Sequence, residues 1–158
     1  MKKLAKLILF FLIITTPVCA DDITDVRIFF DSYVKAANSY DKKLVNFYSP
    51  CAKIIRYVVK DDGSVHEKKV VLSFYEYKKQ LNLLGSVARL KNYKNNYSQI
   101  KITRENDKYK VTAQRQPTTE KYNLPAYFIV QKDLCGDYKI IEEAMHTKDK
   151  RLLKHVEN

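Results

Sequence analysis

Few residues of this sequence could do acid–base or metal chemistry. The three histidines, His66, His146 and His155, lie far apart, and no pair of them has the short spacing typical of metal ligands. Glu142 and Glu143 are adjacent in an expected strand, so their side chains point to opposite faces and cannot work as one carboxylate pair. Only three glycines are present, which excludes glycine-rich phosphate-binding loops. The sequence therefore predicts no metal site, no cofactor and no catalytic residue.

The cysteines indicate a structural role. Cys19 lies in an N-terminal segment that we expect to be removed, which leaves Cys51 and Cys135. Two cysteines without other candidate ligands, in an oxidising compartment, are typical of a disulfide. We therefore expect a Cys51–Cys135 disulfide, with two separately buried thiols as the alternative. A cysteine nucleophile would have to stay reduced, which such a compartment disfavours.

Basic residues gather between residues 89 and 110, with tyrosines among them. Such a mixture can bind single-stranded nucleic acid, an anionic membrane surface or an acidic partner protein. A solvated surface without a specific partner is the alternative. Export of the protein, which the N-terminal residues described next predict, argues against nucleic acid as the ligand. The basic residues are Arg89, Lys91, Lys94, Lys101, Arg104, Lys108 and Lys110, and the tyrosines are Tyr93, Tyr97 and Tyr109.

The N-terminal residues follow the order of a secretory signal peptide. Three lysines give a positive start, an apolar run follows at 7–14, and small residues favour cleavage near Ala20. An uncleaved anchor is the alternative, but the run is much shorter than the roughly 20 residues of a spanning helix. We expect a periplasmic or secreted protein with a signal peptide at 1–20, one domain at 21–147 and a charged tail at 148–158. Loss of the signal peptide lowers the formal net charge from +11 to +8.

Three helices are expected in the first half of the domain. Apolar residues recur every three or four positions over 23–37 and place one apolar stripe on a first helix. Asp41 can cap a short second helix, which Pro50 ends. Ser73 and Glu76 have the spacing of a capping box and predict the start of a third helix.

The remaining segments predict about six strands. Two of them flank a turn at Gly63 and predict a hairpin, and the others alternate apolar and polar residues between short turns. The expected strands are 51–60, 65–71, 99–103, 109–114, 122–131 and 138–146. This order predicts an α+β domain in which three N-terminal helices pack in a strongly curved, mainly antiparallel sheet of about six strands.

The most specific stretch joins the first two helices. Tyr33, Asn38 and Asp41 are followed by the segment 44–50, which leads into the first strand. This spacing resembles the opening of ketosteroid isomerases and their SnoaL-like relatives in the NTF2-like superfamily. The resemblance covers nearly the whole expected domain at the level of element order, and it implies a cone-shaped fold whose interior can hold a pocket.

The same resemblance bears on activity. In the isomerases the first-helix tyrosine donates to a developing oxyanion, and Tyr33 takes this position. Their general base is a carboxylate late in the first strand, where this sequence has Arg56 and Tyr57. Proton abstraction needs a base within hydrogen-bond reach, and no inward acid is evident among the later strands. The resemblance therefore implies aromatic residues that line a pocket, with Tyr33, Phe30, Tyr57 and Phe74 as the candidates.

We expect an exported, non-enzymatic domain that binds a small apolar ligand or docks an envelope partner protein, with dimerisation through the sheet as a compatible arrangement. A SnoaL-like lyase or isomerase with an unplaced acid and base is one alternative. A VirB8-like secretion-system component or a secreted effector is another. An open pocket that holds Tyr33, Tyr57 and a buried acid or histidine would favour an enzyme.

Overall fold

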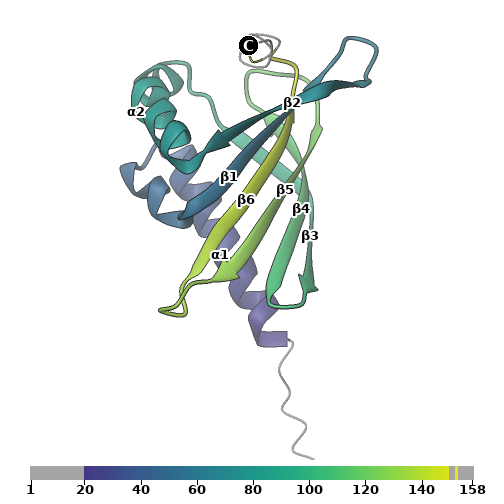
Figure 1. Cartoon of the computed structure of the whole chain (residues 1–158). Helices are drawn as coiled ribbons and strands as arrows, with labels where there is room; N and C mark the ends of the chain where they lie inside the picture. The colour runs from purple at the N-terminus through teal and green to yellow at the C-terminus, as the bar shows by residue number, and fades with distance from the viewer. Residues whose placement is uncertain (1–19, 150–151, 153–158) are drawn as a thin grey trace, which may run out of the picture.

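Figure 1 shows the computed structural model of the protein, which describes residues 20–149 and residue 152. The expected signal peptide lies outside the described residues except for Ala20, and the expected tail is described only at 148, 149 and 152. The described elements are α1 (Ala20–Asn38), the 3-10 helix η1 (Lys42–Phe47), β1 (Tyr48–Val59), β2 (Val65–Ser73), α2 (Phe74–Leu90), β3 (Asn95–Glu105), β4 (Lys108–Pro117), β5 (Leu124–Lys132) and β6 (Tyr138–Thr147). No described helix is long and apolar enough to cross a membrane.

The first helix packs through the stripe that its sequence predicts. Val26, Phe30 and Tyr33 are buried, and the Phe30 ring meets the Phe128 ring of β5 at a centroid distance of 5.0 Å. Ile23, at the start of the stripe, is 38% exposed. The stripe therefore places the C-terminal part of α1 firmly against the sheet.

The caps of the two following helices lie where the sequence predicts them. The Asp41 side chain accepts a hydrogen bond from the Lys43 backbone N–H at the start of η1. Ser73 and Glu76 form the complete capping box of α2, with each side chain bound to the backbone N–H of the other residue. The helix then continues past Gly85 to Leu90, because one glycine weakens a helix without ending it.

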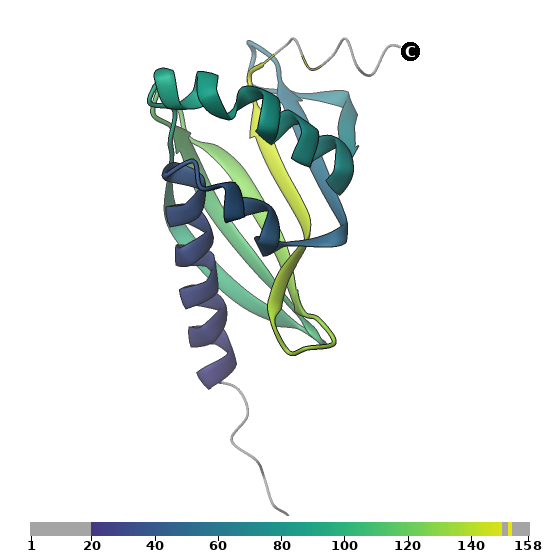
Figure 2. The ribbon, with the colours of Figure 1, turned by 90° about the vertical axis from the view of Figure 1, so that its left-hand side faces the viewer.

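The six strands form one sheet in the order β2-β1-β6-β5-β4-β3. All neighbours are antiparallel except β1 and β6, which run parallel. The register shifts within β1, β3 and β5, and such bulges bend a strand and increase its twist. The sheet consequently curves, and Figure 2 shows α1, η1 and α2 together on one of its faces.

The helices lie in the expected order along the chain, although only the first two are N-terminal to the sheet. Two helical segments precede β1, whereas α2 lies between β2 and β3. The expected hairpin brings the chain back along β2 before α2 begins, so the third helix covers the β1 side of the sheet. The mixed α+β class and the six strands are as expected.

The expected disulfide is wrong. Cys51 and Cys135 are both free and exposed. Cys51 lies in β1 beside the middle of β6, since Tyr48 pairs with Ile140 and Lys53 with Glu142. Cys135 lies in the turn before β6, so at about 3.3 Å per strand residue the two sites are at least about 10 Å apart. That separation exceeds the roughly 7 Å between Cα atoms that a disulfide allows.

Candidate functional site

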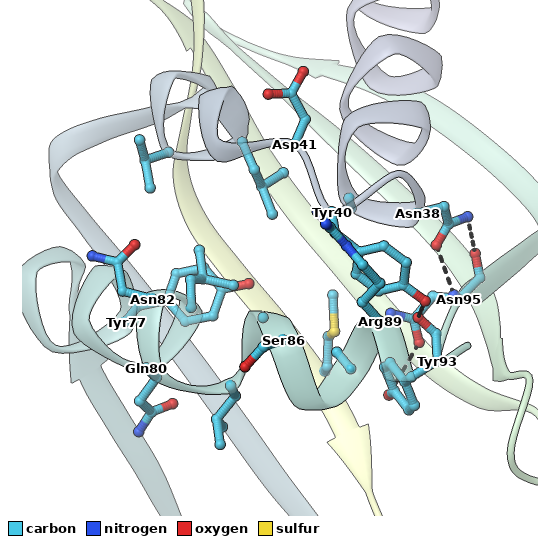
Figure 3. A pocket seen from close by; sticks show the side chains of 18 of the residues that line it. Asn38, Tyr40, Asp41, Tyr77, Gln80, Asn82, Ser86, Arg89, Tyr93 and Asn95 are labelled. Atoms are coloured by element: carbon cyan, nitrogen blue, oxygen red, sulfur yellow. Dashed lines mark hydrogen bonds between the residues drawn. The ribbon is translucent and has the colours of Figure 1, made fainter. Parts of the chain in front are cut away.

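A cavity of about 550 Å³ lies between the helices and the inner face of the sheet (Figure 3). The C-terminal end of α1, the helix η1 and one side of α2 form its walls, and inward residues of β1, β4 and β6 complete it. Its apolar lining consists of Ala37, Leu44, Val45, Leu81, Leu84, Ala88, Met145 and Leu152. A largely apolar concavity with a few polar groups is the usual form of a small-molecule site.

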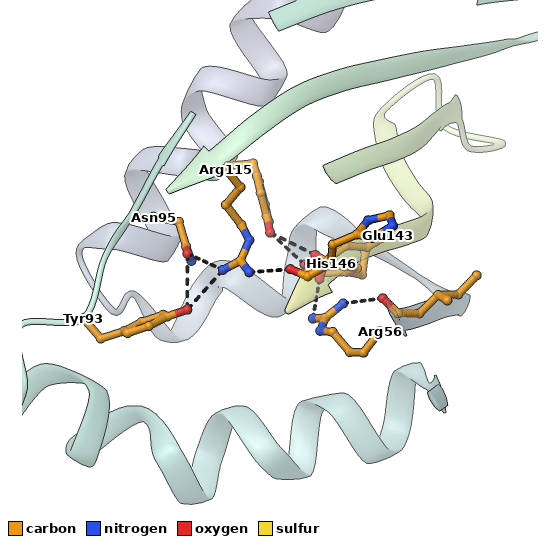
Figure 4. A network of polar contacts seen from close by, with 9 residues as sticks. Arg56, Tyr93, Asn95, Arg115, Glu143 and His146 are labelled. Atoms are coloured by element: carbon orange, nitrogen blue, oxygen red, sulfur yellow. Dashed lines mark hydrogen bonds and ion pairs between the residues drawn. The ribbon is translucent and has the colours of Figure 1, made fainter. Parts of the chain in front are cut away.

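One buried carboxylate lies at the wall of this cavity. Glu143 of β6 is 0% exposed, and its Oε2 accepts hydrogen bonds from the hydroxyls of Tyr33, at 3.0 Å, and Tyr48. Its Oε1 is 2.5 Å from Nη2 of Arg56, which forms an ion pair with it (Figure 4). Tyr33 and Arg56 also line the cavity, so the carboxylate lies directly behind two of the lining side chains.

The charges of this cluster are matched. Burial raises the pKa of Tyr33 and Tyr48 well above the usual value, and the Glu143 charge raises it further. Burial lowers the pKa of Arg56, but the Glu143 carboxylate outweighs this effect and the pKa is raised. Both tyrosines therefore stay protonated at neutral pH and act as donors. A carboxylate has about four acceptor positions, and three strong donors occupy most of those of Glu143.

A second buried arginine lines the cavity from β4. Arg115 is 4% exposed, and its Nη1 donates to Asn95 Oδ1 at 2.8 Å and to the Tyr93 hydroxyl at 3.2 Å. Its Nη2 donates to the His146 carbonyl at 2.8 Å, while its buried Nε has no acceptor (Figure 4). All of these partners are neutral.

The loop between α1 and η1 is tied to the strand β3 beside this arginine. Asn38 and Asn95 exchange two hydrogen bonds of 2.9 Å, as Figure 3 shows. The Tyr40 hydroxyl donates to the Tyr93 carbonyl at 2.7 Å, and the Arg89 guanidinium lies 5.9 Å from the centre of the Tyr40 ring. These contacts fix one end of the cavity and hold its polar groups in place.

The four aromatic candidates do not line the cavity together, although the Phe30 and Tyr33 rings lie 5.9 Å apart between centroids. Tyr33 lines the cavity, whereas Phe30 is packed in the core and Phe74 packs against Tyr48 beside it. Tyr57 lies on the opposite face of the sheet, where its ring stacks on His146 at 4.9 Å. Because side chains alternate along β1, the inward position belongs to Arg56 and excludes Tyr57.

The most informative polar residues of the cavity were missed by sequence reasoning. Alternation correctly separates Glu142, whose carboxylate accepts from Tyr127 on the outer face, from buried Glu143. It does not say which of the two is inward. The inward position of Arg115 could have been predicted, because Arg115 continues the inward series Tyr109, Val111 and Ala113 of β4.

The basic residues between 89 and 110 do not form one element. They are spread over the end of α2, the following connection and the β3–β4 hairpin, and Arg89 is the member that lines the cavity. Arg104 and Lys110 lie over the rings of Tyr109 and Tyr127. Within the described residues, no group of three or more histidine, cysteine or acidic side chains could hold a metal ion.

Comparison with known proteins rests on structure alone, because no family model and no curated protein matches the sequence. An NTF2-like protein of unknown function from Pseudomonas putida matches with a TM-score of 0.61 at 8% identity, over 80% of this chain and 86% of that chain. An NTF2-like protein with a cystatin-like fold from Novosphingobium aromaticivorans gives 0.59 at 9% identity, over 82% and 84%. A candidate ketosteroid isomerase from Shewanella frigidimarina gives 0.54 at 17% identity, over 75% and 91%.

These likenesses extend over most of the chain, at TM-scores of 0.54–0.61. Their identities are too low to carry an activity from one chain to another. The described part of this chain therefore has the NTF2-like fold, which is also called cystatin-like.

Proposed function

We propose that this chain is a non-enzymatic binding domain that holds a small, largely apolar molecule in the cavity between α2 and the sheet. The observation that carries the proposal is the cavity itself, whose volume of about 550 Å³ lies within the range of about 300–1,000 Å³ of ligand sites. Leu81, Leu84, Ala88 and Met145 supply apolar contact area in it. Burial of a ligand's apolar surface there contributes about 25 cal/mol per Å².

The polar groups of the cavity support binding over catalysis. A general base must accept a proton from the substrate, and Glu143 is occupied by Arg56 and two tyrosines. Of the acids that line the cavity, Asp41 caps η1 and is exposed, and Asp149 lies beyond the end of β6. Neither accepts the hydrogen bond of the Tyr33 hydroxyl, which goes to Glu143.

Two neighbouring residues of α2 allow a matched test. Ala88 lines the cavity, whereas Val87 is 45% exposed and is not among the lining residues. Ala88→Trp should fill the cavity and abolish binding of the neutral dye Nile red, while Val87→Trp should leave its binding unchanged. Fluorescence titration measures both. Equal dye binding by wild type and Ala88→Trp would overturn the proposal.

A SnoaL-like lyase or isomerase is the second candidate, and one observation favours it. Tyr33 lines the cavity and bonds to a buried acid at 3.0 Å, as an oxyanion-binding tyrosine would. Turnover of a β,γ-unsaturated ketosteroid that is lost in Tyr33→Phe would support this candidate. Failure of wild type to turn over that substrate, combined with stoichiometric ligand binding, would favour the binding domain.

We also propose export, with a mature chain that begins near Asp21. The support is the sequence of the N-terminal segment. Mass spectrometry of protein recovered from the periplasm or the medium measures the mature N-terminus directly. Recovery of intact Met1 from the membrane fraction would favour an anchor.

Docking of an envelope partner has a candidate surface on α2. Its Leu83, Leu84, Val87 and Leu90 are 45–87% exposed, and none of its residues is fully buried. Exposed apolar side chains in a row often belong to an interface. We place ligand binding first because the cavity is a concave feature with defined polar groups, whereas the helix face offers apolar side chains alone.

A further inference from the structure

Two arginines line the cavity, Arg56 half-buried and Arg115 buried, and they differ in how their charge is compensated. Arg56 reaches in from β1 and forms an ion pair with the buried carboxylate of Glu143. Arg115 reaches in from β4 and forms no ion pair with any described residue, because its partners there are an amide oxygen, a hydroxyl and a carbonyl. Both lie in the same cavity, so the second arginine leaves one positive charge without a counter-charge.

A buried charge of this kind is costly. Removal of an ion from water costs several kcal/mol even in a real protein interior, and a polar group without a partner adds to that cost. Arg115 is 4% exposed and its Nε has no acceptor. Its neutral partners fix the orientation of the guanidinium, but they leave its charge unmatched.

The geometry of the guanidinium favours one kind of partner. Arginine binds carboxylates through parallel N–H donors, and such charge-assisted bonds are about twice as strong as neutral ones. Asn95, Tyr93 and His146 accept hydrogen bonds from Nη1 and Nη2, whereas the buried Nε–H has no acceptor. The guanidinium therefore keeps one donor without an acceptor and a charge without a counter-charge.

The other charged groups of the lining lie elsewhere. Arg89 lies over the Tyr40 ring, and Lys42 belongs to the exposed start of η1. Asp41 accepts a hydrogen bond from the Lys43 backbone N–H, and Asp149 follows the end of β6, where it has interactions of its own. Of the two arginines that reach in from the sheet, Arg56 has a carboxylate partner and Arg115 has only neutral partners among the described residues.

We propose that Arg115 binds the carboxylate of an amphipathic monoanion whose apolar part fills the rest of the cavity. This inference rests on the proposed ligand-binding function and specifies the class of ligand. A single unmatched guanidinium suits a single negative charge, and Leu81, Ala88 and Met145 suit an apolar chain or ring. A neutral molecule of the same shape would leave the Arg115 charge unmatched and would bind less tightly.

Decanoate and decanol provide the test, because they share a chain and differ in charge. Isothermal titration at neutral pH should show that wild-type protein binds decanoate about tenfold to hundredfold more tightly than decanol. Arg115→Gln should lose this preference and bind the two ligands with similar affinity. Arg104→Gln removes the same charge from an exposed site outside the cavity and should retain the preference.

The outcomes separate the two proposals. Binding of decanol as tightly as decanoate would overturn this inference and leave the apolar-ligand proposal intact, whereas absence of binding of Nile red, decanol and decanoate would overturn both. If Arg115→Gln does not fold, a crystal structure of wild-type protein with decanoate gives the same answer. A carboxylate against the Arg115 guanidinium supports the assignment, and a carboxylate beside Lys42 or Arg89 overturns it.

Discussion

The Tyr33 hydroxyl on α1 donates a hydrogen bond of 3.0 Å to Glu143 on β6, across 110 positions of sequence. Tyr48 at the start of β1 and Arg56 further along β1 contact the same carboxylate. Three elements that are distant in sequence are thus joined at one buried point in the cavity wall. The cluster stabilises the shape of the cavity. We therefore expect its removal to lower the free energy of unfolding of the protein.

Replacement of Glu143 by glutamine should strongly destabilise the protein. The change leaves the Arg56 guanidinium buried without a counter-charge, and breaking one side of a buried ion pair costs about 3–5 kcal/mol. Urea denaturation followed by circular dichroism measures the free energy of unfolding. Glu142→Gln is the matched control, because the neighbouring side chain lies on the outer face and bonds to Tyr127. Equal losses of stability in the two variants would show that the Arg56–Glu143 ion pair does not stabilise the fold.

Stability should fall above about pH 10 through the buried tyrosines. Burial raises the pKa of Tyr33 and Tyr48 far above the value of about 10 that applies in the unfolded chain. The unfolded state therefore loses these protons first, so their contribution is complete below pH 10 and declines as the pH rises beyond it. The slope is at most about 1.4 kcal/mol per pH unit for each tyrosine.

The variant Tyr33→Phe isolates this effect from the titration of surface lysines. Its free energy of unfolding, measured at several alkaline pH values, should decline less steeply than that of wild type. Tyr75→Phe is a suitable control, because Tyr75 is 76% exposed. A slope in Tyr33→Phe identical to that of wild type would show that this hydroxyl does not stay protonated in the folded protein.

Both cysteines of the described domain should react as free thiols. Cys51 and Cys135 are exposed, and their places in β1 and in the β5–β6 turn prevent a bridge. Alkylation of folded protein without reductant should add two groups, as measured by intact mass. Replacement of both by serine should change the free energy of unfolding by less than about 0.5 kcal/mol. An intramolecular disulfide in purified protein would contradict the geometry.

The parts of the fold that depend on local sequence were predictable. The stripe of α1 and the capping box at Ser73 and Glu76 are set by spacings of three and four residues, and both are confirmed. The hairpin of β1 and β2 follows from its turn. The number of cysteines, in contrast, says nothing about the distance between them, which is why the disulfide prediction failed.

The side chains that face the cavity cannot be predicted from the sequence of a single strand. Alternation along β1 assigns Arg56 and Tyr57 to opposite faces but does not say which faces inward. The bulge between Tyr48 and Lys53 shifts the pairing of β1 with β6. The number of residues after Tyr33 therefore does not determine whether Arg56 or Tyr57 faces inward. The partnership of Arg56 with Glu143 requires the parallel pairing of the first and last strands, which no local pattern predicts.

A double-mutant cycle tests whether Arg56 and Glu143 act as one unit. Arg56→Met leaves the carboxylate buried with only two tyrosine donors, and Glu143→Gln leaves the guanidinium unpaired. The double variant removes both charges and leaves a neutral amide beside the tyrosine hydroxyls. Its loss of stability should therefore be smaller than the combined losses of the single variants, by about 1–3 kcal/mol. Additive losses would mean that the two charges are stabilised independently of each other. The ion pair would then not be what holds this part of the cavity wall together.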